Sequence, residues 1–229
     1  MAWVPLESNP DVMTKFMHTL GVPKKWGLVD VYGLDPELLA LVPKPVAAVI
    51  LLYPISQNTE LYKAELEKKE IEKGTKNNNV YHLDQYVSNA CGTVAIIHSI
   101  ANKLDEIKLE SGVLKEFLDE TKDLDSKQRG EKLVKAQSIS STHEEFSQEG
   151  QTEPPSEDEK VIHHFLAFIE KDGSIYELDG RKPFPINHGK SSPETFLEDA
   201  ARVCKEYMAH EPGQVLFTVM AIADIENAN

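Results

Sequence analysis

The chain has 229 residues, of which 41% are hydrophobic and 27% are charged. This composition is ordinary for one large globular domain or two small ones, and it excludes a collagen-like or wholly disordered chain. The 38 acidic residues outnumber the 24 basic ones and give a formal net charge of −14. That charge argues against nucleic-acid binding, because neutralising phosphates requires clustered Lys and Arg. It is compatible with a basic protein or peptide partner, or simply with a well-solvated surface.

The two cysteines, Cys91 and Cys204, do not form a Cys-x-x-Cys pair, which argues against a zinc knuckle or a redox motif. We expect reduced thiols and a cytoplasmic protein, with the nucleus as a second location. The first ten residues lack the basic region and apolar run of a signal peptide. The longest strongly apolar run, residues 46–53, is too short for a bilayer-spanning helix, which needs about 20 residues. We therefore expect no membrane anchor.

The first half of the chain should alternate helices and one buried strand. Ser8-Asn9 can cap an amphipathic helix over residues 10–20, and a short helix should follow at 36–41. Residues 46–53 are continuously apolar and rich in β-branched side chains, which predicts a strand buried on both faces in the middle of a covered sheet. Residues 58–73 are strongly charged and have a helical pattern.

The second half should begin with an apolar core helix at Cys91, followed by amphipathic helices over 113–120 and 126–139. Residues 142–160 then contain seven acids, two prolines and few hydrophobic residues, which indicates a long loop. After it we expect two strands over residues 161–170 and 174–178, a final helix over 193–209 and a closing strand over 215–223.

The acidic segment 142–160 has two interpretations, a linker between two domains or a long loop within one domain. The part that follows it is too short to form an independent core. We therefore predict a single domain over residues 1–229 with a long loop, and loops of this length inside compact domains are usually functional.

Cys91 lies at the predicted start of an apolar helix, where Ser88 or Asn89 would be the cap. A helix N-terminus stabilises a thiolate through its partial positive charge, and its free N–H groups can stabilise an oxyanion. A buried cysteine at a helix start would have no such role. The chemistry of a thiol hydrolase additionally requires a base and a group that orients it.

The strand 161–170 contains two candidate bases, His163 and His164, which alternate to opposite faces of the strand. Periodicity alone does not choose between them. Asp179 follows the next predicted strand and could orient an imidazole, although an Asp-Gly turn is the simpler interpretation. Gln85, six residues before Cys91, could complete an oxyanion hole. Cysteine, histidine and aspartate in this order are typical of a papain-like arrangement.

Several motifs resemble those of the small, single-domain ubiquitin C-terminal hydrolases, and the resemblance extends over almost the whole chain. The motifs are Gln85 with Asn89-Ala-Cys-Gly-Thr93, Glu149-Gly-Gln-Thr152, His164-Phe165 and the run from Leu178-Asp-Gly-Arg181 to Asn187-His-Gly189. The resemblance implies that Cys91 is the nucleophile, His164 the base, and Asp179 the residue that orients His164. Gln85 and the Cys91 N–H would form the oxyanion hole.

The same resemblance implies an α/β (α+β) fold with a papain-like three-layer arrangement. A central, mostly antiparallel sheet would lie between helical layers, and the backbone would be knotted. Residues 142–160 would be the crossover loop that passes over the active site. This loop would favour small or flexible leaving groups attached to the C-terminal glycine of ubiquitin.

The resemblance also names the expected partner, ubiquitin or a ubiquitin-like modifier, whose basic tail carries two arginines. The residues that would contact ubiquitin are Pro5, Leu6, Glu7, Asp11, Asp30 and Gln151. For each acid the plainer alternative is a solvated surface charge.

Two other functional classes use the same residues, a ubiquitin-binding protein with little turnover and an acyltransferase that uses the same thioester. Retention of all four catalytic residue types favours the hydrolase. We expect no cofactor and no metal, because His98 lies two helical turns from Cys91. We read Cys204 as a core residue and expect a monomer.

Overall fold

The computed structural model describes residues 2–74, 79–153, 155 and 161–227. Its centre is a six-stranded sheet with the strand order β1-β6-β2-β3-β4-β5, in which every pair of neighbours is antiparallel. The strands are β1 (Trp26–Asp30), β2 (Val46–Pro54), β3 (His163–Lys171), β4 (Ser174–Leu178), β5 (Ile186–Lys190) and β6 (Thr218–Asp224). The strand expected at 46–53 is therefore confirmed as β2, which lies between β6 and β3.

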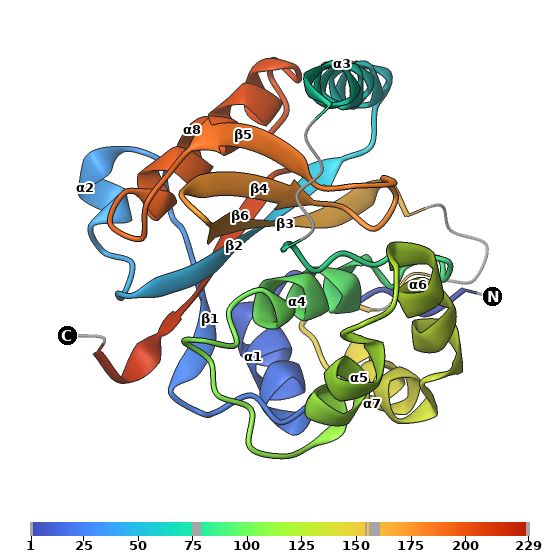
Figure 1. Cartoon of the computed structure of the whole chain (residues 1–229). Helices are drawn as coiled ribbons and strands as arrows, with labels where there is room; N and C mark the ends of the chain where they lie inside the picture. Colours follow the sequence, from blue (N-terminus) through green and yellow to red (C-terminus); the bar gives the residue numbers. More distant parts are fainter. Residues whose placement is uncertain (1, 75–78, 154, 156–160, 228–229) are drawn as a thin grey trace.

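Helices cover both faces of this sheet and form a three-layer arrangement (Figure 1). One layer contains α2 (Pro36–Leu39), α3 (Gln57–Lys73) and α8 (Phe196–Ala209). The other contains α1 (Pro10–Thr19), α4 (Cys91–Ala101), α5 (Val113–Thr121), α6 (Ser126–Lys135) and α7 (Gln137–Ser147). A short 3₁₀ helix, η1 (Ile225–Asn227), follows β6. The expected fold class, a central antiparallel sheet between helical layers, is confirmed.

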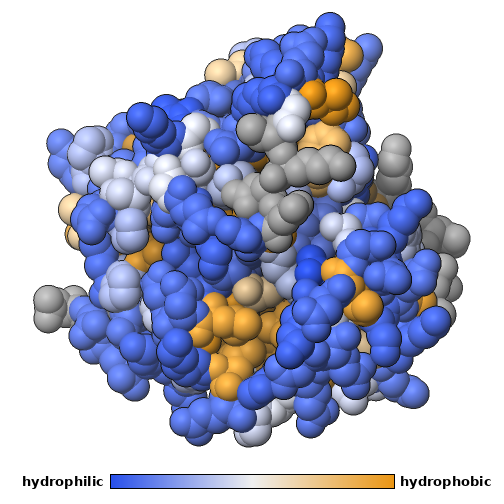
Figure 2. Space-filling view, in the orientation of Figure 1, coloured by the Kyte–Doolittle hydropathy of each residue, from blue (hydrophilic) through white to orange (hydrophobic). Residues whose placement is uncertain are grey.

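Each face of the sheet has its own hydrophobic core. On β2, alternate side chains such as Ile50 and Leu51 enter different cores, because successive residues of a strand point to opposite faces. Ile50 packs in the core beneath α1 and α4, and Leu51 packs in the core beneath α8. The face of the molecule seen in Figure 2 is largely hydrophilic, in line with the net charge. Within the described ranges, no helix is long and apolar enough to cross a membrane.

Local sequence signals account for the helices that were predicted well. Asn9 caps α1 by accepting hydrogen bonds from the N–H groups of Asp11 and Val12. Ser56 and Thr59 form a reciprocal capping box at the start of α3, and Gly74 ends that helix in the left-handed conformation.

The structure corrects the expected helix 126–139 and the expected loop 142–160. The first is broken at Ala136, whose ψ of 79° is not helical, so two helices, α6 and α7, replace it. The second helix continues to Ser147 and occupies the first third of the expected loop. It forms because Ile139, His143 and Phe146 make a buried stripe that its polar composition conceals. Residues 154 and 156–160 of the expected loop lie outside the described residues.

Candidate active site

Cys91 is the first residue of α4, a helix that is buried along almost its whole length against β3. The predicted cap is wrong, because neither Ser88 nor Asn89 caps this helix and the N-cap residue is Ala90. Asn89 instead adopts a left-handed conformation, with φ of 64°, and its amide donates a hydrogen bond to the carbonyl of Trp3 at 3.0 Å. The first turn of α4 therefore has no side-chain cap.

The thiol of Cys91 is buried and lies beside His164 and the backbone N–H of Phe165. Burial alone raises the pKa of a thiol, since it disfavours the charged thiolate. Here the hydrogen bond from His164, its charge and the N–H of Phe165 outweigh that effect, so the pKa of Cys91 is lowered. The site therefore favours the thiolate, which is the nucleophilic form.

His164, on β3, is the histidine that the structure places beside Cys91. Its Nε2 atom donates to Asp179 Oδ1 at 2.7 Å, which leaves Nδ1 for the thiol. Burial lowers the pKa of an imidazole, but the charge of Asp179 and the hydrogen bonds to Asp179 and Cys91 raise the pKa of His164 to about 9. His163 is only partly buried, and burial alone lowers its pKa. The open choice between the two histidines is thus decided by geometry.

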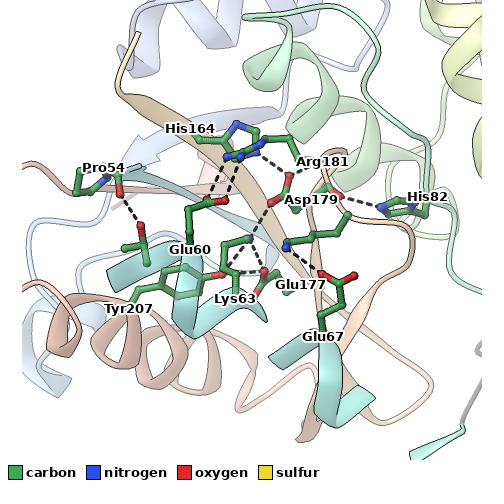
Figure 3. Close-up of polar contacts among 12 residues, drawn as sticks. Pro54, Glu60, Lys63, Glu67, His82, His164, Glu177, Asp179, Arg181 and Tyr207 are labelled. Atoms are coloured by element: carbon green, nitrogen blue, oxygen red, sulfur yellow. Dashed lines mark hydrogen bonds and ion pairs between the residues drawn. The ribbon is translucent and has the colours of Figure 1, made fainter. Parts of the chain in front are cut away.

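Asp179 follows β4 directly and is held at three atoms (Figure 3). Oδ1 accepts from His164 and from the N–H of Arg181 at 2.9 Å, and Oδ2 lies 2.7 Å from Lys63 Nζ. Its carbonyl accepts from His82 Nε2 at 3.0 Å. Burial raises the pKa of a carboxyl, but the charges of His164 and Lys63 hold the pKa of Asp179 well below its usual range.

Gln85 lies beside the end of β4. Its N–H donates to the carbonyl of Gly180 at 2.7 Å, and its side-chain Nε2 donates to the carbonyl of Val87 at 3.0 Å. Because an amide nitrogen carries two N–H groups, one remains for a further acceptor. Gly180 allows this approach, since an added Cβ there would lie 2.8 Å from Gln85 Cβ. Gln85, six residues before α4, is therefore fixed to the strand end that carries Asp179.

The residues expected to contact a partner lie in two acidic groups near the N-terminus. Glu7 accepts from the N–H groups of Gln151 and Thr152, at 3.1 and 3.0 Å, and from the Thr152 hydroxyl at 2.7 Å. Asp11 and Asp30 form the second group: burial and the charge of Asp11 raise the pKa of Asp30.

The N-terminal segment packs against the start of α4, which carries Cys91. Pro5 is half-buried, and Leu6 is buried and packs against Gly92, directly after the candidate nucleophile. Leu6 therefore supports α4 in the free protein, whereas Asp11 is exposed at the surface.

Two residues around Asp179 were missed from the sequence, Lys63 and His82. Both are buried. Lys63 lies in a helix whose charge indicated a solvated surface, although Thr59, Tyr62 and Leu66 mark a buried stripe at helical spacing. No pattern in the sequence predicts that His82 lies beside Asp179.

Cys204 is fully buried in the core beneath α8, and burial raises its pKa, as expected of a core thiol. Among the residues with described positions, no three His, Cys, Asp or Glu side chains are grouped as metal ligands.

The comparisons with known proteins agree with this geometry. The model of the ubiquitin carboxyl-terminal hydrolase family 1 matches residues 3–209. The chain belongs to this family. It is 49% identical over 224 residues to a ubiquitin carboxyl-terminal hydrolase of Drosophila melanogaster, covering 97% of each chain. It is 42% identical over 222 residues to the human ubiquitin carboxyl-terminal hydrolase isozyme L1, covering 95% of this chain and 96% of the relative.

A solved structure confirms the fold of this family member. The UCH37 catalytic domain of Trichinella spiralis, bound to ubiquitin vinyl methyl ester, superposes with a TM-score of 0.76 at 27% identity. The match covers 98% of this chain and 96% of that one. The chain is thus a cysteine-type hydrolase of the ubiquitin carboxyl-terminal hydrolase family, and its buried Cys91, His164 and Asp179 form a connected set suited to nucleophilic acyl transfer.

Proposed function

We propose that this hydrolase cleaves amide, ester or thioester bonds after the C-terminal glycine of ubiquitin, with Cys91 as the nucleophile. The observation that carries the proposal is the paired perturbation of two buried groups, a thiol whose pKa is lowered and an imidazole whose pKa is raised to about 9. Each shift favours the charged form, a thiolate on Cys91 and an imidazolium on His164, and that pair is the reactive state of a cysteine hydrolase.

In the proposed reaction, the Cys91 thiolate attacks the carbonyl carbon of the terminal glycine. The oxyanion of the tetrahedral intermediate is stabilised by the Cys91 N–H and by the side-chain amide of Gln85. His164 then gives its proton to the leaving amine, and the bond to the leaving group breaks to form a thioester. Asp179 keeps the imidazole oriented throughout.

Hydrolysis of the thioester regenerates the enzyme. A water molecule attacks the thioester carbonyl while His164 accepts one of its protons, and the Cys91 thiolate leaves. The products are ubiquitin with a free C-terminal carboxylate and the released adduct. No step of this reaction requires a cofactor.

The acidic residues Asp11 and Asp30 favour a substrate with a basic tail. Burial and the nearby charge of Asp11 raise the pKa of Asp30, so a cation beside Asp30 would be favourable. We assign Asp11 and Asp30 to the arginines of the ubiquitin tail. Glu7 and Gln151 are joined by a hydrogen bond just after α7, within the expected crossover loop, which we propose limits the leaving group to small or flexible adducts.

A ubiquitin-binding protein with little turnover is the alternative. The connected thiol, imidazole and carboxylate in the free protein favour the enzyme over that alternative.

The proposal is tested with ubiquitin vinyl methyl ester, an electrophile that reports a reactive thiol next to a ubiquitin site. The wild-type chain and a Cys204→Ser variant should each gain the mass of one ubiquitin, because Cys204 is buried in the core. A Cys91→Ser variant should gain none. An adduct on Cys204, or none on the wild type, would contradict the proposal.

A further inference from the structure

Lys63, on α3, is a buried lysine next to the catalytic groups. Only 2% of its surface is exposed, although α3 is one of the most charged helices in the chain. An ammonium group removed from water is tolerated where charges and hydrogen bonds replace the lost solvation. The contacts of Lys63 therefore identify what its charge is used for.

The ammonium of Lys63 lies among the carboxylates of Asp179 and Glu177 and the side chain of Tyr207 (Figure 3). Nζ is 2.7 Å from Asp179 Oδ2, 2.9 Å from Glu177 Oε1 and 3.2 Å from the hydroxyl of Tyr207. It also lies 5.3 Å from the ring centroid of Tyr53 and 5.6 Å from that of Tyr207, within the range of cation–π attraction.

Glu177 has other partners besides Lys63. Its Oε1 accepts from the hydroxyl of Tyr207 at 2.8 Å, and its Oε2 accepts from His188 Nε2 at 2.8 Å. The orientation of Glu177 is thus fixed from α8 and β5 without the lysine.

Asp179 depends on Lys63 in a different way. Its Oδ1 is held by His164 and by the N–H of Arg181, whereas the contact at Oδ2 comes from Lys63. The guanidinium of Arg181 pairs with Glu60 instead. Oδ2 accepts no hydrogen bond from the described residues, so the ion pair with Lys63 is the interaction that favours this rotation of the carboxylate plane and the direction from Oδ1 to the imidazole.

We propose that Lys63 is a positioning residue of this hydrolase, which holds the second oxygen of Asp179 so that the first oxygen orients His164 towards Cys91. This inference rests on the proposed function for its effect on turnover. Lys63 itself touches neither the thiol nor the imidazole, so it acts through Asp179.

Lys63 also moderates the charge that His164 experiences. Besides Lys63 and Glu177, the titratable groups that face Asp179 and His164 are Cys91 and His98 from α4, His82 from the segment before it, Tyr53 from β2 and Arg181 after β4. Removing the ammonium leaves both buried carboxylates to attract the imidazolium. The imidazolium then loses its proton at a higher pH.

The test compares Lys63→Met and Lys63→Arg with a matched control, Lys103→Met. Lys103 is also a buried lysine between two acids, with Nζ 3.0 Å from Glu106 and 3.5 Å from Glu170, but it lies beyond the far end of α4. Loss of Lys103 thus reproduces the loss of a buried ion pair without touching Asp179.

Two readouts are measured on folded protein. The first is kcat and KM for a ubiquitin C-terminal amide. The second is the pH profile of iodoacetamide alkylation at Cys91, followed by mass spectrometry, which needs no ubiquitin. If the proposed function fails, the wild type releases no amide, yet the alkylation profile still tests Lys63.

We expect Lys63→Met to lower kcat by about tenfold or more with little change in KM, because small displacements of a catalytic group are costly. The part of its alkylation profile that reports loss of the His164 proton should move to higher pH by about half a unit or more. Lys63→Arg should restore both values, and Lys103→Met should match the wild type. Wild-type kcat and alkylation profile in Lys63→Met would overturn the proposal, as would equal losses in Lys103→Met.

If Lys63→Met does not fold, the double variant Lys63→Met/Glu177→Gln replaces it. This variant removes one positive and one negative charge from the same buried cluster, so the net charge is kept. We expect it to retain the loss of kcat, because Asp179 Oδ2 still lacks its ammonium. A kcat equal to that of Glu177→Gln alone would overturn the proposal.

Discussion

His143 on α7 should make the stability of the protein depend on pH. The ring is fully buried, with Nδ1 2.7 Å from the hydroxyl of Thr93 and Nε2 2.7 Å from the carbonyl of Val4. Because the carbonyl accepts, Nε2 carries the proton, and the hydroxyl donates to Nδ1. Burial lowers the pKa of His143 from 6.5 to about 4, against the smaller raising effect of the bond to Val4.

The sign follows from the two pKa values. The folded state holds His143 neutral down to about pH 4, whereas the unfolded chain takes up a proton near pH 6.5. The stabilisation is therefore complete above pH 6.5 and is lost as the pH falls towards 4. Proton linkage gives a loss of about 2 kcal/mol between pH 7 and pH 5.

The assay is the free energy of unfolding from urea titrations at pH 7 and pH 5. His143→Gln should lose about 2 kcal/mol less than the wild type between these pH values. Thr93→Val removes the hydrogen bond but keeps the titrating ring, so it should retain the wild-type pH dependence at lower overall stability. If His143→Gln loses as much stability as the wild type, the reasoning is wrong.

Three further predictions concern the acidic groups and the strand end. Asp30→Lys should raise KM for a ubiquitin substrate more than it lowers kcat, and an unchanged KM at matched ionic strength would refute the binding role of this acid. Glu7→Gln should speed hydrogen exchange at the amides of residues 151–152, which Glu7 accepts from in the wild type; equal exchange rates would count against that anchor. Gly180→Ala should lower kcat about tenfold, because its Cβ would displace Gln85, and a kcat within twofold of the wild type would contradict this.

The elements with strong local signals could be predicted from the sequence. β2 is a continuous apolar strand, and α1 combines a cap at Asn9 with a regular apolar stripe. β1 and β5 could not be predicted, because each has five residues and includes a glycine. β1 forms by pairing with β6, which is distant in sequence, and β5 forms by pairing with β4.

The site shows the same division between local and long-range information. Motifs identified Cys91, His164, Asp179 and Gln85, and the structure brings the first three into contact. The pairing of Lys63 with Asp179 joins residues that are far apart in the chain, so no local sequence pattern predicts it. Conversely, the polar composition of α7 concealed a helix whose buried stripe packs against α1.

The central claim is that Cys91, activated by His164, hydrolyses bonds at the ubiquitin C-terminus. The most direct measurement is release of a fluorescent amide from the C-terminus of ubiquitin by the wild type and by Cys91→Ala, with ubiquitin binding measured for both. We expect release by the wild type, none by Cys91→Ala, and retained binding in both proteins. No release by a wild type that binds ubiquitin, or undiminished release by Cys91→Ala, would contradict it.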